Sequence, residues 1–190
     1  MKIKKNMALS GFAIVTALAL AGCSVPAAPT TAPTGSTSSS SSAPVVLPVT
    51  SNPIRNQATN ADLSVLAAGV EDLVDPVTKK AMNDRLMLTL KNTGTKQLDG
   101  FEVYYEMTDA VTGTKEGYYQ KLDGFTLAAG AQDFVYFDNQ SGAGHYPENQ
   151  FSIYRSSKNQ VDFKIQVSAN GAKIAEASAK KSVGTGEKVD

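Results

Sequence analysis

One group of polar residues in the second half of the chain has the side-chain types used in nucleophilic catalysis. His145 is the only histidine, and Asp138, Ser141 and Glu148 lie close to it in sequence. A serine nucleophile, an imidazole base and a carboxylate that orients the base are the parts of a hydrolytic triad. No nucleophile-elbow pattern precedes Ser141, so a loop histidine beside Tyr146 is the simpler interpretation. We expect no enzyme activity and keep a hydrolase using the Ser141–Glu148 loop as an alternative.

Metal sites are the second chemistry to consider. A single imidazole has no partners for a transition metal. Calcium needs only oxygen ligands, and two acidic stretches are candidates: Asp123 with Asp138 and Asn139, and Glu71 with Asp72 and Asp75. Neither has the spacing of a known calcium loop, and acids in turns commonly accept hydrogen bonds from the backbone. We therefore expect no metal and no cofactor.

Tyrosines indicate a possible binding surface. The chain has seven tyrosines and no tryptophan. Tyr104 falls on the face of its segment opposite Phe101, and neighbouring Tyr118 and Tyr119 must point to opposite faces of a strand. Exposed tyrosines supply apolar area with a hydroxyl group, which suits recognition of a protein or a glycan. Candidate partner-binding residues are Tyr104, Tyr119 and Tyr146, and cross-strand packing on a solvated sheet is the alternative.

The only cysteine, Cys23, follows an apolar run over residues 7–21 that is headed by three lysines. A basic start, an apolar stretch and small residues before a cleavage point are the parts of an export signal. The run is too short for a helix that spans a bilayer. An unpaired thiol at the start of an exported chain is a liability, and lipidation would remove it.

Leu20, Ala21, Gly22 and Cys23 stand in the order of a lipobox, so the N-terminus resembles that of bacterial lipoproteins. The resemblance implies cleavage between Gly22 and Cys23 and acyl chains on Cys23. It also implies a protein anchored in the cell membrane or outer membrane that faces outside the cytoplasm. The expected partners are the membrane, through Cys23, and a protein or glycan that the sequence does not identify.

Charge excludes one class of partner. The chain has 18 basic and 18 acidic side chains, and three of the lysines precede Cys23 while no acid does. The mature chain then has 15 against 18, a net charge of −3. It lacks the basic surface of a nucleic-acid-binding protein, so we expect no nucleic-acid partner.

Composition divides the chain into four parts. Residues 1–22 are the predicted signal peptide, and residues 23–60 are the lipidated cysteine with a Ser/Thr/Pro-rich linker that we expect to be disordered. Val45, Val46 and Leu47 could add a short strand to the domain edge, although Pro44 and Pro48 favour a free linker. Residues 61–182 are the predicted domain, and residues 183–190 a flexible tail.

Short segments with alternating apolar residues, separated by Gly, Asn and Asp, predict strands throughout the domain. These segments are residues 63–67, 86–91, 101–108, 116–122, 125–127, 132–138, 151–154, 161–168 and 172–180. Residues 101–108 alternate most regularly, which predicts a central strand with Phe101 facing inward. Asn170 and Gly171 predict a hairpin turn, and the Ala-rich return segment is expected to be an edge strand, with a helix as the alternative.

The turns between these strands follow in a definite order: Asn92-Thr93-Gly94 comes after one strand, Asp109 closes the next, and Leu127-Ala128-Ala129-Gly130 precedes another. This order resembles the immunoglobulin-like modules of bacterial surface lipoproteins, including the CARDB-like type. The resemblance implies an all-β fold with a single immunoglobulin-like β-sandwich and says little about function. The expected protein is a lipid-anchored surface lipoprotein displaying a non-enzymatic binding or structural module. An accessory subunit docked on an envelope transporter or wall-synthesis complex is an alternative.

Overall fold

The computed structural model describes residues 46–71, residue 77 and residues 85–184. The predicted cleavage and lipidation at Gly22 and Cys23 lie outside these residues, as do Asp72, Asp75 and the end of the tail from residue 185. Among the residues that the structure describes, no helix has the length and apolar character needed to cross a membrane.

Eight strands and one short helix make up the described domain. They are β1 (Leu63–Glu71), β2 (Arg85–Asn92), β3 (Glu102–Asp109), β4 (Lys115–Lys121), β5 (Gln132–Phe137), β6 (His145–Tyr146), α1 (Ile153–Ser156), β7 (Val161–Ala169) and β8 (Ala172–Lys181).

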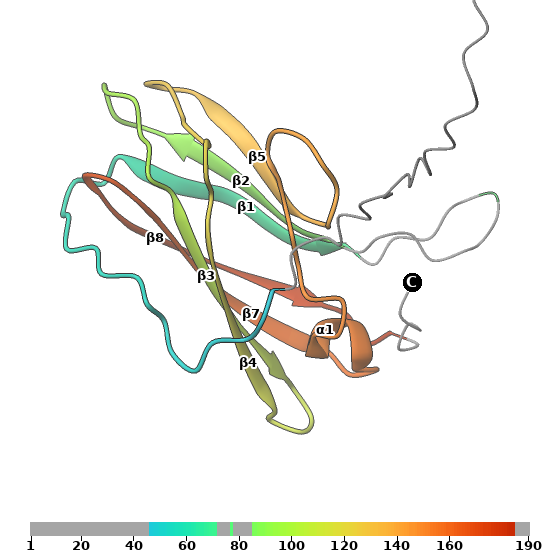
Figure 1. Ribbon diagram of the computed structural model, residues 1–190. Coiled ribbons are helices and arrows are strands. Elements are labelled where there is room, and N and C mark those ends of the chain that lie inside the picture. Colours follow the sequence, from blue (N-terminus) through green and yellow to red (C-terminus); the bar gives the residue numbers. More distant parts are fainter. Residues whose placement is uncertain (1–45, 72–76, 78–84, 185–190) are drawn as a thin grey trace, which may run out of the picture. The chain divides into compact units, whose positions relative to one another are not determined.

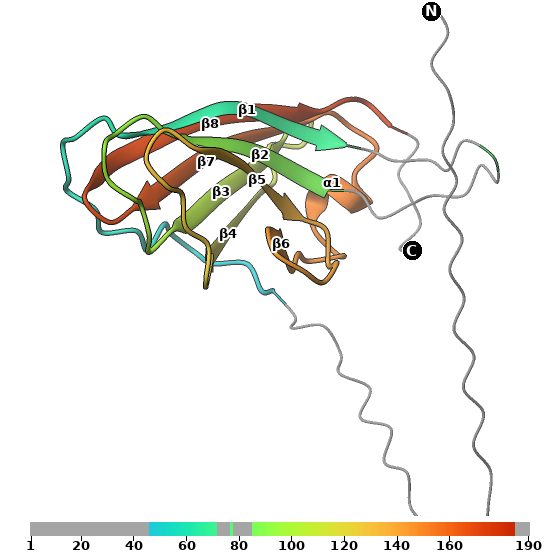
Figure 2. The same ribbon diagram turned by 90° about the horizontal axis from the view of Figure 1, so that it is seen from above.

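The strands form two four-stranded sheets that pack face to face, which confirms the predicted all-β sandwich (Figure 1). One sheet has the order β1-β2-β5-β6 and the other the order β4-β3-β7-β8. All neighbours are antiparallel except β5 and β6. At one side of the sandwich β1 and β8, one from each sheet, lie close together (Figure 2).

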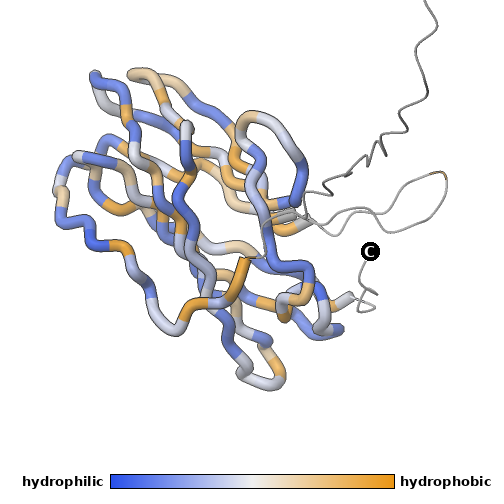
Figure 3. The backbone as a smooth tube through the Cα atoms, in the orientation of Figure 1, coloured by the Kyte–Doolittle hydropathy of each residue, from blue (hydrophilic) through white to orange (hydrophobic). Residues whose placement is uncertain are grey.

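Period-2 alternation decides which side chains enter the core. Along β3 every second residue is buried, and Phe101, Val103, Tyr105 and Met107 are each at most 4% exposed. The predicted central strand with Phe101 facing inward is therefore confirmed. The same alternation runs along β7, and apolar and polar positions succeed each other on the strands in Figure 3.

The return segment after the Asn170-Gly171 turn is β8, the outer strand of its sheet, as predicted. The expected strand at residues 125–127 is reduced to one bridge between Leu98 and Leu127. This segment connects β4 of one sheet to β5 of the other. Its apolar side chains, Phe125 and Leu127, are buried there.

The predicted strand at residues 151–154 is wrong, because helix α1 lies there instead. The Ser152 carbonyl accepts hydrogen bonds from the backbone N–H groups of Arg155 and Ser156, both at 3.1 Å. The N–H of Ile153 donates to the Glu116 carboxylate of β4 at 3.0 Å. The Glu116 carboxylate, which is distant in sequence, thus supports the N-terminus of α1. The alternation of apolar residues did not indicate this helix.

Residues 46–60, which we name the strap, correct the expected boundary at residue 61. The strap crosses the outer face of the β4-β3-β7-β8 sheet before it enters β1 (Figure 1). Its Val49 N–H donates to the Gly117 carbonyl of β4 at 2.7 Å. The Asn56 amide donates to Ser168 Oγ and to the carbonyls of Ala169 and Ala172 at 2.8–3.1 Å. These residues are therefore part of the domain and not of a free linker.

Candidate functional site

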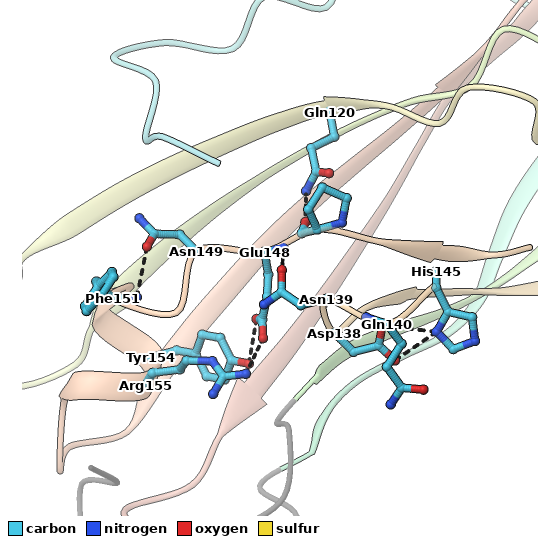
Figure 4. Close-up of polar contacts among 11 residues, drawn as sticks. Gln120, Asp138, Asn139, Gln140, His145, Glu148, Asn149, Phe151, Tyr154 and Arg155 are labelled. Carbon is cyan, nitrogen blue, oxygen red and sulfur yellow. Dashed lines mark hydrogen bonds and ion pairs between the residues drawn. The ribbon is translucent and has the colours of Figure 1, made fainter. Parts of the chain in front are cut away.

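The loop that leaves β5 brings Asp138 and His145 together (Figure 4). His145 Nδ1 lies 3.0 and 2.9 Å from the two Asp138 carboxylate oxygens. The Asp138 side chain is fully buried, and the His145 ring is 23% exposed. An ionised carboxylate only accepts hydrogen bonds, so Nδ1 carries the hydrogen and Nε2 of the neutral ring is an acceptor.

The short strand β6 holds the histidine in place. His145 pairs with Tyr136 of β5, and the two rings stack with centroids 5.0 Å apart. The Tyr136 N–H donates to the Gly144 carbonyl at 2.8 Å. Gly144 has φ of 80°, and a Cβ there would lie 2.9 Å from the Phe134 carbonyl oxygen. The absence of a side chain at Gly144 thus allows β6 to lie against β5.

A second polar cluster fixes the far end of the loop. The carboxylate of Glu148 accepts a hydrogen bond from the Tyr154 hydroxyl at 2.9 Å and forms an ion pair with Arg155. The Glu148 and Arg155 side chains are 3% and 6% exposed. Burial and the charge of Glu148 raise the pKa of the neighbouring Tyr105 hydroxyl. Glu148 is therefore committed to holding the loop and is not available as a triad carboxylate.

Side chains of β4 attach the loop to the other sheet. Gln120 donates to the Pro147 carbonyl at 2.8 Å, and Asn149 donates to the Tyr118 hydroxyl at 3.0 Å. The Tyr118 hydroxyl itself donates to Glu116 at 2.8 Å, and burial together with that carboxylate raises the pKa of Tyr118. The loop is thus held by both sheets.

A pocket of about 440 Å³ lies beside this loop. Its walls come from three places: the turn at residues 123–126, the start of β5, and the glycine-rich turn that leads into β6. The side chains that bring polar groups to this lining are Asp123, Thr126, Asp133, His145 and Tyr146. We name this hollow the loop pocket.

Comparison with known proteins adds no functional assignment. No family model matches the chain, and no curated protein matches it. Among solved structures, alkylpurine DNA glycosylase AlkC of Pseudomonas fluorescens, bound to DNA with an abasic-site analogue, shares 21% identity at a TM-score of 0.31. That similarity covers 63% of this chain and 30% of the glycosylase.

A GH20 exo-β-N-acetylglucosaminidase of Vibrio harveyi, in complex with N-acetylglucosamine, shares 16% identity at a TM-score of 0.22. Here 69% of this chain and 19% of the enzyme are covered. The chain therefore spans less than a third of either protein, and similarity at these scores carries no inference about activity.

The structure brings two of the three candidate tyrosines together. Tyr104 of β3 and Tyr119 of β4 are direct cross-strand partners on the outer face of their sheet, and both are half-buried. The Tyr119 hydroxyl donates to Glu102, and burial with this carboxylate raises the pKa of Tyr119 to about 12. The strap crosses this face beside Tyr104, where Asn52 and Tyr104 line the same hollow. The pair is therefore a partly covered surface.

Tyr146 lies elsewhere, in β6, with its ring 6.1 Å from that of Phe137. It packs against the core and lines the loop pocket. Burial and the charge of Asp123 raise the pKa of Tyr146, so its hydroxyl keeps its proton at neutral pH. The three tyrosines do not form one patch.

The structure can be compared with the hypotheses of a catalytic triad and of a calcium site. Asp138 and His145 make the contact that a triad would need between its carboxylate and its imidazole, whereas Ser141 is exposed and, among the described residues, has no hydrogen bond to His145. Within the described part of the chain, no three His, Cys, Asp or Glu side chains gather closely enough to hold a metal ion. Both Asp138 oxygens lie within 3.0 Å of His145 Nδ1, and Oδ1 also accepts the Gln140 N–H at 3.1 Å.

Sequence reasoning missed Thr126 and Asp133 as pocket residues. Each is a single polar residue in or beside a turn, which is the common position for such residues. Asp123 was noted only as a calcium candidate. The pocket forms where the turn at residues 123–126 and the turn that leads into β6 line the same hollow, and no local sequence pattern indicates that arrangement.

Proposed function

We propose that the protein is a lipid-anchored component of the cell envelope that displays its sandwich as a non-enzymatic binding module. The observation that carries this proposal is the Leu20-to-Cys23 sequence behind a basic and apolar leader. Two or three acyl chains on Cys23 would give stable attachment, since one chain alone binds membranes only marginally. The resemblance to CARDB-like surface modules agrees with this role.

The start of the strap sets the reach of the module under this proposal. Under this proposal, the Ser/Thr/Pro-rich composition of residues 24–45 predicts a tether between Cys23 and the strap. A flexible chain of this length has an r.m.s. span of about 25 Å. That span places the sandwich next to the membrane and within reach of other envelope components.

Membrane fractionation tests the anchor. The wild-type chain and a Cys23→Ser variant are expressed in a bacterium that processes lipoproteins, and both are followed by fractionation and intact-mass measurement. We expect the wild type in the membrane fraction, with the mass of a chain that starts at Cys23 and bears acyl groups. The serine variant should leave that fraction. Recovery of the unprocessed wild-type chain in the cytosol would refute the proposal.

Hydrolysis is a second candidate, favoured by the contact between Asp138 and His145 Nδ1. With Nδ1 held by the carboxylate, Nε2 is free to act as a general base toward a nucleophile. A fluorophosphonate probe tests this function directly. Labelling that a Ser141→Ala substitution abolishes would support hydrolysis, and absence of labelling of the folded wild type would exclude a serine hydrolase of this kind.

A further inference from the structure

The loop pocket has the dimensions and the rigid walls of a small-molecule site. Its volume of about 440 Å³ falls within the range of ligand pockets, which is roughly 300–1,000 Å³. It lies beside the loop that both sheets hold, and the β5–β6 backbone hydrogen bonds fix its inner wall. A site held in this way loses little conformational entropy when a ligand binds.

Two of its side chains are oriented by contacts outside the pocket. His145 is held by the Asp138 carboxylate on one side and by the Tyr136 ring on the other. Tyr146 rests against Phe137. Neither ring needs to reorganise in order to meet a ligand.

The polar groups of the pocket are mostly acceptors. Asp123 has no hydrogen-bond partner among the described residues, and Asp133 uses one oxygen to accept the Phe134 N–H at 2.8 Å. In the neutral tautomer that donates from Nδ1 to Asp138, Nε2 of His145 also accepts. Hydroxyls of Thr126 and Tyr146 both donate and accept. The pocket therefore fits a ligand that presents several donors.

The charged side chains that line the loop pocket restrict the class of ligand it can bind. Among the residues that the structure describes, two aspartates line the pocket and no lysine or arginine does. A phosphate or carboxylate would meet these carboxylates without a compensating cation, so anionic ligands are disfavoured. Vicinal hydroxyls of a sugar can donate to both oxygens of a carboxylate, and a sugar's C–H face packs on an aromatic ring such as that of Tyr146.

We propose that the loop pocket binds a neutral saccharide of one or two rings, with Asp123 and Asp133 accepting hydrogen bonds from its hydroxyls and Tyr146 contacting its apolar face. This inference rests on the proposed role as a displayed binding module and names the ligand class of that module. His145 and Thr126 supply the remaining polar contacts.

Saturation-transfer NMR on the full chain in detergent micelles tests the proposal. The probes are three neutral disaccharides (cellobiose, maltose and N,N′-diacetylchitobiose), n-butylammonium as a cation, and glucose 6-phosphate as an anionic sugar. We expect at least one neutral disaccharide to bind with a dissociation constant of the order of 1 mM, in the range of a few hydrogen bonds and one ring contact. Glucose 6-phosphate should bind at least tenfold more weakly.

The decisive variant is Asp123→Asn combined with Asp133→Asn. Both carboxylates are exposed, so the melting temperature should stay unchanged, and disaccharide binding should weaken at least tenfold. Asp162→Asn is the matched control, because Asp162 lies on the outer face of the other sheet. Its affinity should equal that of the wild type.

Three results would overturn the inference. The first is no disaccharide binding up to about 10 mM, which is roughly the weakest affinity expected of such a site. The others are equal disaccharide binding by the wild type and the double Asn variant, or binding of n-butylammonium alone. None of them bears on the anchor, which the Cys23→Ser fractionation measures separately. A chain that is acylated and membrane-bound but fails to bind disaccharides would therefore disprove only the ligand class.

Discussion

At the scale of single residues, the buried pair of Glu148 and Arg155 carries a large desolvation cost. Both side chains are almost fully buried, and the second carboxylate oxygen of Glu148 accepts from Tyr154. Replacing only one partner leaves a desolvated charge behind, which is far more damaging than removing the pair. The conformation of the loop after β5 therefore depends strongly on both residues of the pair.

We predict that Arg155→Met lowers the free energy of unfolding by about 3–5 kcal/mol, measured by urea denaturation. Adding Glu148→Gln should restore part of this loss. The matched control is Lys115→Met, since Lys115 pairs with Glu106 at 2.7 Å on the exposed surface. That change should cost less than about 1 kcal/mol. Equal losses for the two single variants would contradict the prediction.

Asp109 is the carboxylate whose ionised form the fold favours most clearly. It accepts hydrogen bonds from the Ser157 hydroxyl, the Asn159 amide and the backbone N–H groups of Val111 and Thr112. These donors, led by Ser157, hold the pKa of Asp109 far below its ordinary value. The residue thereby ties the β3–β4 turn to the segment between α1 and β7.

Because the folded pKa of Asp109 is lowered, its contribution to stability is present above pH 4 or so and is lost as the pH falls toward the folded value. We predict that Asp109→Asn lowers stability at pH 7 and flattens the acid limb of the stability curve below about pH 4. Urea midpoints between pH 2 and pH 7 measure both effects. A variant with an acid limb as steep as that of the wild type would contradict the assignment.

At the scale of elements, strand β6 depends on the absence of a side chain at Gly144. The Gly144 φ of 80° is strained for other residues, and a Cβ would also lie 2.9 Å from the Phe134 carbonyl oxygen. Backbone rather than a flexible side chain stands in the way, so β6 must shift away from β5. This shift would move His145 and Tyr146 together.

We predict that Gly144→Ala costs about 2–4 kcal/mol of unfolding free energy and perturbs the NMR signals of His145 and Tyr146. Gly113→Ala is the matched control, because Gly113 has a similar φ of 71° and nothing within 4 Å of its Cβ position. The control should cost only about 1 kcal/mol. Equal costs would show that the steric contact has no effect beyond backbone strain.

Strands were predictable from the sequence where residues within the strand or in the adjoining turn determine them. Alternation over residues 101–108 predicted β3, and the Asn170-Gly171 turn predicted β8 against its Ala-rich helix propensity. Helix α1 was not predictable in this way, because its N-terminus is supported by Glu116 from a distant strand. The histidine loop was recognised from residue types alone, but its pocket depends on the turn at residues 123–126.

At the scale of the whole molecule, the strap changes where the domain begins. Its two prolines, two threonines and one serine resemble a linker in composition, and the expected boundary at residue 61 follows from that composition. Asn52, Asn56 and Asn60 nevertheless all donate to the β7–β8 hairpin, and Ile54 is only 7% exposed. Polar side chains spaced along an irregular segment can attach it to a sheet without any apolar pattern.

We predict that a chain starting at residue 46 keeps the melting temperature of the full chain, whereas a chain starting at residue 61 melts at a clearly lower temperature. Burial of Ile54 contributes about 2 kcal/mol, and the partly buried hydrogen bonds of the Asn56 amide contribute about 1 kcal/mol each. For a domain of this size a loss of about 3–5 kcal/mol corresponds to a shift of the melting temperature by roughly 10–20 °C.

Two single substitutions in the full chain serve as controls. Asn56→Ala should reproduce part of the shift. Asn60→Ala removes one exposed hydrogen bond of 3.3 Å and should reproduce little of it. Equal melting of the two shortened chains would show that the strap only rests on the sheet, and the tether would then extend to residue 60.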